Sequence, residues 1–280
     1  MLRSIIILAL SLSSCLIAAG QIQVSDPNPV VHKLSLSNVY SVSPAEQQRI
    51  VGVVLNGIGT VFHQKDSEFF DEIAERIRFE FQTLGYFKVF VNKPLVKAIG
   101  KDGEREVVDV DVRVDEGAQY RLKKIQLKNG SAFPLTELRA AFPIADADIF
   151  DRAKIARGLE TLRQLYAGKG FVNFSAVPET MVDEDAHTIS LSLDLDEGEI
   201  FYLGTLTVLG VESEPGARAR LLTMWNSYQG KIYDYRLLPL FLKDVGARPE
   251  VKPEQIFKIS PDAKAKVVNV SMTLAKPPVF

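Results

Sequence analysis

The sequence is poor in the residues that form disulfides and metal sites. It has one cysteine, Cys15, and three histidines, His32, His63 and His187, among 280 residues. A single cysteine excludes a disulfide within the chain, so the fold must be stabilised by core packing. No HxxxH or CxxC spacing is present, and we expect exposed or strand-edge histidines, no metal site and no cofactor.

The chain also lacks an excess of charge and, beyond residue 20, an apolar run of membrane length. Its formal net charge is −2, whereas nucleic-acid-binding proteins usually carry a basic excess. A transmembrane helix needs about 20 apolar residues. Apolar residues make up 46% of the chain, which is enough for a buried core. We therefore expect no nucleic-acid partner and no membrane span in the processed chain.

The first twenty residues have a different composition from the rest. Arg3 precedes an apolar run over residues 5–19, and small residues follow up to Gly20. This pattern is typical of a secretory signal peptide, here residues 1–20, cleaved after Gly20. Two alternatives remain open. The stretch "LSSC" would make Cys15 a lipidated N-terminus, and an uncleaved segment would act as an anchor.

Patterns that carry catalysis are missing. The stretch "GIGT" at residues 57–60 lacks the lysine and the spacing of a phosphate-binding loop, and no G-x-S-x-G is present. Two acidic pairs, Asp115–Glu116 and Asp196–Glu197, occupy equivalent places in a repeat. They are therefore not expected to converge on one site as a glycosidase pair does. We expect no enzyme activity.

The sequence contains an internal repeat. An alternating strand runs into Asp115, Glu116 and Gly117, and the same pattern returns at Asp196, Glu197 and Gly198. A fixed-period match of this kind indicates tandem structural units. Glycine permits a turn at low steric cost, and the acids are expected to keep that turn in water. We interpret both triplets as junctions between units.

Three units result when the chain is aligned on these triplets. Each begins with a short strand, at residues 34–38, 125–129 and 206–210, and a phase slip just before two of these strands predicts a bulge. Two helices follow; the second is capped by a glycine in units one and two, and Pro239 is expected to kink it in unit three. A glycine-led strand and a strongly alternating strand end each unit, the latter at residues 107–114, 188–195 and 267–274.

These elements predict an α+β protein of three tandem β-α-α-β-β modules, each a three-stranded mixed sheet with two helices on one face. The predicted bounds are residues 31–117, 118–198 and 199–280, with the third module diverged. Trp225 is expected to end the first helix of module 3 and to pack in its core. The chain resembles tandem POTRA modules, the polypeptide-transport-associated domains of BamA-type outer-membrane assembly proteins. It stops at Phe280 without barrel strands, so a stand-alone array is expected.

The resemblance implies a function in binding. POTRA modules are thought to receive unfolded barrel precursors and partner proteins, partly by adding a strand to a sheet edge. In the family the second strand is the exposed one, which here corresponds to residues 87–92, 171–177 and 248–252. Pro249 and Pro253 are expected to blunt the third edge. The candidate peptide-binding residues are Val172, Asn173, Phe174, Ser175, Phe87, Val89 and Val91.

The resemblance therefore predicts a non-enzymatic scaffold that captures unfolded outer-membrane proteins or a barrel-assembly complex. It implies a periplasmic location, associated with the outer membrane, or a lipoprotein anchored through Cys15. The alternative is a cell-division or envelope scaffold that uses similar modules for protein–protein contacts.

Overall fold

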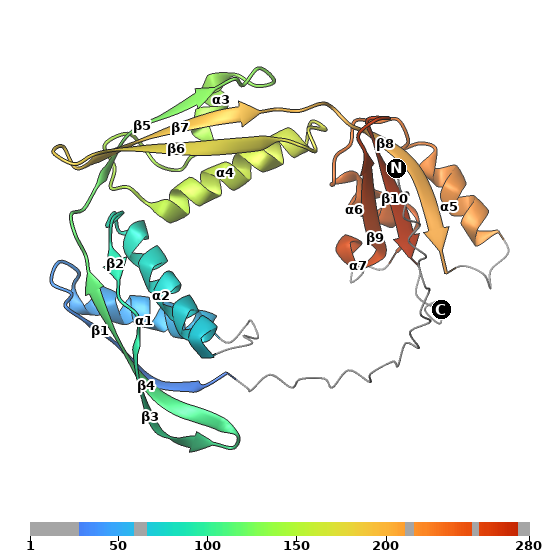
Figure 1. Ribbon diagram of the computed structural model, residues 1–280. Coiled ribbons are helices and arrows are strands. Elements are labelled where there is room, and N and C mark those ends of the chain that lie inside the picture. Colours follow the sequence, from blue (N-terminus) through green and yellow to red (C-terminus); the bar gives the residue numbers. More distant parts are fainter. Residues whose placement is uncertain (1–27, 59–65, 211–215, 248–251, 274–280) are drawn as a thin grey trace, which may run out of the picture.

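The computed structural model describes residues 28–58, 66–210, 216–247 and 252–273 (Figure 1). The expected signal peptide, Cys15, His63 and part of "GIGT" lie outside these residues, as do residues 248–251 and Phe280. No helix in the described part of the chain is long and apolar enough to cross a membrane.

Three separate sheets follow one another along the chain, and we call them modules 1, 2 and 3. In each sheet the last strand is central, parallel to the first strand and antiparallel to the strand before it. The mixed-sheet architecture is therefore confirmed. The strands are β1 (Val30–Ser37), β2 (Phe90–Val91), β3 (Leu95–Asp102) and β4 (Arg105–Asp115) in module 1; β5 (Arg121–Lys128), β6 (Ser175–Asp183) and β7 (Thr188–Asp196) in module 2; and β8 (Tyr202–Leu209), β9 (Phe257–Asp262) and β10 (Val267–Thr273) in module 3.

Two helices stand between the first and second strands of each module, as expected. They are α1 (Pro44–Gly57) and α2 (Asp66–Thr83), α3 (Leu135–Ala140) and α4 (Arg152–Ala167), and α5 (Ala217–Trp225) and α6 (Leu237–Asp244). Module 3 has an extra short helix, α7 (Pro253–Ile256). The start of α1 is fixed by Ser43, whose side chain accepts a hydrogen bond from the backbone N–H of Glu46, three residues on.

The helices pack on one face of each sheet and form its core. In β4 the side chains of Val108, Val110, Val112 and Val114 are buried, while the residues between them face water. They pack in one apolar cluster with α2 residues such as Ile77. Modules 2 and 3 have equivalent clusters of their own. The pure alternation of the last strand therefore corresponds to a helix-covered face and an open face.

The bulge predicted for modules 2 and 3 is present in both, and module 1 has one as well. The register between the first and last strands shifts between Val31 and Lys33 in β1, and between Leu122 and Lys124 in β5. In module 3 the same irregularity lies opposite Val268 and Val270. The shift explains why the apolar pair that opens modules 2 and 3 is out of phase with the strand it precedes.

Two expectations for module 3 have different outcomes. Trp225 ends α5 and is buried, and its indole N–H donates to the carbonyl of Gly204 over 2.9 Å. Pro239, however, does not kink a helix. Because α6 begins only at Leu237, Pro239 lies in the first turn, where a missing N–H breaks no intrahelical bond.

Candidate binding edges and module junctions

The edge strands lie later in the sequence than predicted. In module 2 the outer strands are β5 and β6; β6, which corresponds to the prediction, begins at Ser175, so Val172 and Asn173 form a turn before it. Phe174 stacks on Tyr166 with ring centroids 4.0 Å apart. In module 3 the edge is β9, not residues 248–252, of which only Lys252 is described.

In module 1 the predicted edge residues are also largely interior. Val89 and Val91 are both buried in the module core. Phe87 leaves module 1 altogether and packs edge-to-face on Tyr120 and Phe150 of module 2. The exposed edge is formed by β2 and β3, which pair with the same side of β4. The strand β3 was not anticipated from the sequence.

The turn at the start of each predicted edge strand joins two modules. Gly85 adopts a positive φ of 89°, and its carbonyl accepts the backbone N–H of Tyr120 over 2.8 Å. Gly170, with φ of 85°, binds Phe201 in the same way. Two residues after each glycine, Phe87 and Val172 pack against the core of the next module. Both glycine-led turns are therefore docking elements.

The acids of the repeated triplets do more than keep a turn in water. Glu116 is buried, and its carboxylate accepts the backbone N–H groups of Tyr40, Ser41 and Val42 over 2.9–3.2 Å. Each triplet's glutamate thus reaches back to the loop that follows the first strand of its own module. The expectation that both acids of each triplet are solvated was wrong for the glutamate.

Glu197 repeats this arrangement in module 2. It accepts the N–H of Ser131 over 2.7 Å, the N–H of Ala132 over 2.9 Å and the hydroxyl of Tyr166 over 2.8 Å, while the Ser131 hydroxyl donates over 2.5 Å. Burial raises the pKa of Glu197, but the hydrogen bonds from Ala132 and Ser131 outweigh it and lower the pKa to about 2. The ionised carboxylate therefore holds this loop in place.

The junction between modules 1 and 2 has charged side-chain contacts. Lys88 of module 1 forms an ion pair with Glu184 of module 2, and the Lys88 ammonium lowers the pKa of that carboxyl. Arg152 donates to Gln82 over 2.6 Å and lies 5.2 Å from the ring centre of Phe79. In the described part of the chain no ion pair joins modules 2 and 3.

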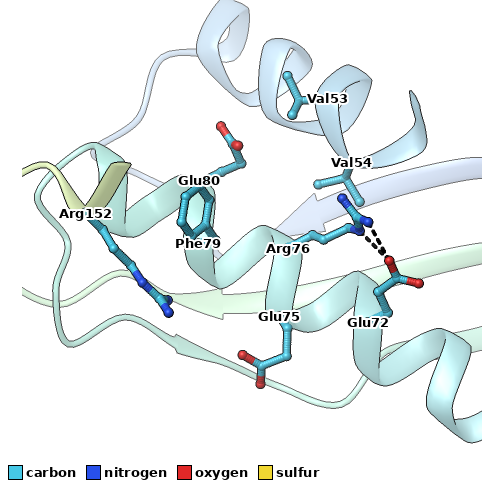
Figure 2. A pocket seen from close by; sticks show the side chains of 8 residues that line it. All are labelled: Val53, Val54, Glu72, Glu75, Arg76, Phe79, Glu80 and Arg152. Atoms are coloured by element: carbon cyan, nitrogen blue, oxygen red, sulfur yellow. Dashed lines mark hydrogen bonds and ion pairs between the residues drawn. The ribbon is translucent and has the colours of Figure 1, made fainter. Parts of the chain in front are cut away.

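A shallow groove lies beside the first junction (Figure 2). Val53 and Phe79 form its apolar part, and Glu72 pairs with Arg76 across 2.6 Å at its side. Arg152 approaches Phe79 from module 2 in the same view. Three glutamates and two arginines line the groove. Glu72 pairs with Arg76 within it, whereas Glu75 and Glu80 pair with Arg78 and Arg49 outside it.

The described histidines and acids do not gather into a metal site. His32 bonds to Asp109 over 2.9 Å on the open face of module 1, and His187 packs edge-to-face on Tyr120. Among the residues that the structure describes, no three histidine, cysteine or acidic side chains are placed to hold an ion.

The true edge strands expose apolar side chains on the open face of their sheets. In module 1 these are Phe90, 60% exposed, and Leu95, 70% exposed. In module 2 they are Val177, 64% exposed, and Met181, 54% exposed. The register sets each pair opposite open-face residues of the central strand, four positions apart. The open-face residues of β9 are polar: Lys258, Ser260 and Asp262.

Comparison with known proteins identifies a family match in module 2. Residues 120–198 match the family model described as POTRA, surface antigen variable number repeat. The crystal structure of Haemophilus influenzae BamA POTRA3-5 superposes with a TM-score of 0.60 at 19% identity, covering 89% of this chain and 96% of that one.

The chain resembles a tandem array of POTRA modules. It is 23% identical over 181 residues to the outer membrane protein assembly factor BamA of Neisseria meningitidis serogroup B, covering 59% of this chain and 22% of that protein. BamA of Buchnera aphidicola is 23% identical over 159 residues, with 56% and 24% covered. The chain therefore spans less than a quarter of the length of these relatives.

Proposed function

We propose that the protein is a non-enzymatic binding scaffold in outer-membrane protein assembly. It would capture extended segments of unfolded outer-membrane proteins, or of a barrel-assembly complex, by adding them as strands to module edges. The observation that carries this proposal is that two of the outer strands, β3 and β6, expose the apolar side chains of Leu95 and Val177. The names of the curated relatives, outer membrane protein assembly factors, support the process.

The backbone of an open edge supplies the affinity. An edge strand offers unpaired N–H and C=O groups that pair with any extended peptide, while neighbouring side chains select among peptides. The exposed apolar residues favour segments with apolar side chains at alternate positions. Modules 1 and 2 are therefore better receptors than module 3, whose open-face edge residues are polar.

Pro178 indicates which residues of β6 offer their backbone. A proline within a sheet lies where its missing N–H would have faced away from the partner strand. Because the outward groups alternate, Thr180 and Val182 also point outward, and Met181 points toward β7. An added strand would thus bind at Thr180 and Val182.

The proposed location is the periplasm, in association with the outer membrane. The export signal predicted at residues 1–20 and the similarity to BamA support it. Attachment through a lipid on Cys15 is the alternative route to the same membrane. A scaffold for cell division or for the envelope is the competing function.

Photo-crosslinking in living cells tests the function. A photoreactive residue at Val177, and separately at Leu95, should capture outer-membrane proteins or assembly factors, identified by mass spectrometry. Tyr235, 49% exposed in module 3 outside the strands, is the control position. Equal yields at Tyr235 contradict edge binding, and recovery of division or wall-synthesis proteins favours the competing function.

A proline pair tests the mechanism. Thr180→Pro removes an outward N–H and leaves the pairing with β7 intact, so capture at Val177 should fall several-fold while module 2 stays folded. Met181→Pro removes an N–H that bonds to β7 and should instead destabilise the sheet. Unchanged capture in Thr180→Pro would refute strand addition at β6.

A further inference from the structure

The open edges of modules 1 and 2 carry opposite charges. Along the edge that includes β3, Lys93, Lys97 and Lys101 are exposed, and the acid of β3, Asp102, pairs with Arg105 across 3.3 Å. Along β6 the charged residues are Glu179 and Asp183. Asp183 lies 3.6 Å from Lys123, but no ion pair joins Lys97 or Glu179 to any residue that the structure describes. Two exposed edges of opposite charge are thus left without partners inside the chain.

We propose that β3 of one copy of this chain pairs with β6 of a second copy, antiparallel, with Lys97 opposite Glu179. This register also sets Leu95 opposite Met181. Each pair lies on the open face of the combined sheet, because Leu95 and Lys97 face the same side as Asp111 and Asp109. Alternating apolar and charged pairs therefore match along the contact.

The backbone supports the same register. The N–H of Asn92 donates to the carbonyl of Arg113, so Arg113 faces the β2–β3 side of β4. By alternation Asp111 and Asp109 face it as well, and Leu95 and Lys97 point inward. Val96 then points outward. In the proposed register Val96 lies opposite Thr180, the outward residue of β6, and the two exchange both backbone hydrogen bonds.

Charge explains why unlike edges meet. If β3 paired with another β3 about Lys97, lysine would face lysine at that position. If β6 paired with another β6 about Glu179, two glutamates would meet, although Val177 would face Met181. Like charges directly opposite are destabilising, so both homotypic contacts are disfavoured. The heterotypic contact keeps the apolar match and removes the repulsion.

The contact is short and joins copies head to tail. Pro94 and Pro178 lie at the limits of the paired segment, and the register of β3 shifts after Ala98. A small interface gives weak, concentration-dependent association. Because each copy uses a different edge at each contact, a dimer joined by one contact leaves one edge of each kind free, and further copies can add until a ring closes.

Charge reversal tests the pairing by sedimentation velocity at protein concentrations from about 10 µM to about 1 mM. Lys97→Glu alone and Glu179→Lys alone should each raise the apparent dissociation constant about tenfold. An equimolar mixture of the two variants, and the double variant, should restore the wild-type value, because each contact again joins opposite charges. Lys124→Glu, the same change on strand β5, is the control and should alter association little.

Disulfide trapping tests the register. In a Cys15→Ser background, Leu95→Cys mixed with Met181→Cys should yield a disulfide-linked dimer in larger amount than either variant alone. The proposal is overturned if the chain stays monomeric over the whole concentration range. It is also overturned if mixing the two charge-reversal variants does not restore association. The pairing shares its edges with the proposed function but fails separately: loss of self-association with continued capture of clients at Val177 refutes the pairing alone.

Discussion

Replacing Glu197 by alanine removes the carboxylate that holds the loop between β5 and α3. Hydrogen bonds to an ionised group contribute about 1.5–3 kcal/mol each. The Ser131 groups are exposed and regain water, so their loss costs little. The Ala132 N–H and the hydroxyl of Tyr166, a fully buried residue, are less able to do so. The expected cost to module 2 is therefore about 3 kcal/mol.

Amide hydrogen exchange in β7 is the appropriate assay. The single tryptophan, Trp225, lies in module 3, so its fluorescence does not report on module 2. The exchange free energy at Leu193 should fall by about 3 kcal/mol in Glu197→Ala. Glu199→Ala, which removes an exposed ion pair with Lys266 nearby, should cost less than about 0.5 kcal/mol.

A loss no larger in Glu197→Ala than in Glu199→Ala would refute the reasoning. It would mean that the loop between β5 and α3 is fixed by packing of Phe133 and Leu138, and that the hydrogen bonds to Glu197 contribute nothing measurable.

Three further outcomes follow from the same contacts. The pKa of Glu197 is about 2 in the folded chain and about 4.3 when unfolded, so the stabilisation it provides is complete above about pH 4.5 and declines toward pH 2. The unfolding free energy, measured by urea titration across this pH range, should lose this acid dependence in Glu197→Gln. Gly170→Ala places a Cβ 2.8 Å from the carbonyl oxygen of Phe201 at a positive φ. It should lower the unfolding free energy by about 1–2 kcal/mol and change the small-angle scattering profile. Gly230→Ala, also at a positive φ but with open space around the new Cβ, should leave that profile unchanged. Trp225→Phe leaves the carbonyl of Gly204 without its donor and should lower the unfolding free energy of module 3 by about 2 kcal/mol. Denaturant unfolding followed by circular dichroism measures this loss, and an unchanged unfolding midpoint would contradict it.

The elements that the sequence predicted best are those with strong periodicity. The alternating valines of β4 and the apolar stripe of α2 specify a strand and a helix through local geometry, so both were found. The strand β3 was missed, although Asp102–Gly103 before an alternating run is a typical hairpin signal. Its residues are exposed along their whole length, which leaves no buried face to produce a clear pattern.

The candidate site was predicted less well for a related reason. Phe87 and Phe174 belong to apolar stretches that look like strand in the sequence, but their partners are Tyr120 and Tyr166, 33 and 8 residues away. A glycine with positive φ turns the chain before either residue can enter a sheet. The length of that turn depends on the neighbouring module, which a local pattern does not contain.

The sequence by itself determined the number of modules, their order of strands and helices, and the place of the repeated triplets, because each follows from short-range periodicity or from self-similarity. Only the tertiary structure decided that Glu116 and Glu197 hold loops more than sixty residues earlier in the chain, and that β3 and β6 are outer strands. Those outcomes depend on which backbone groups remain unpaired once the three sheets have formed, and hydrogen bonding across such distances leaves no local signature in the chain.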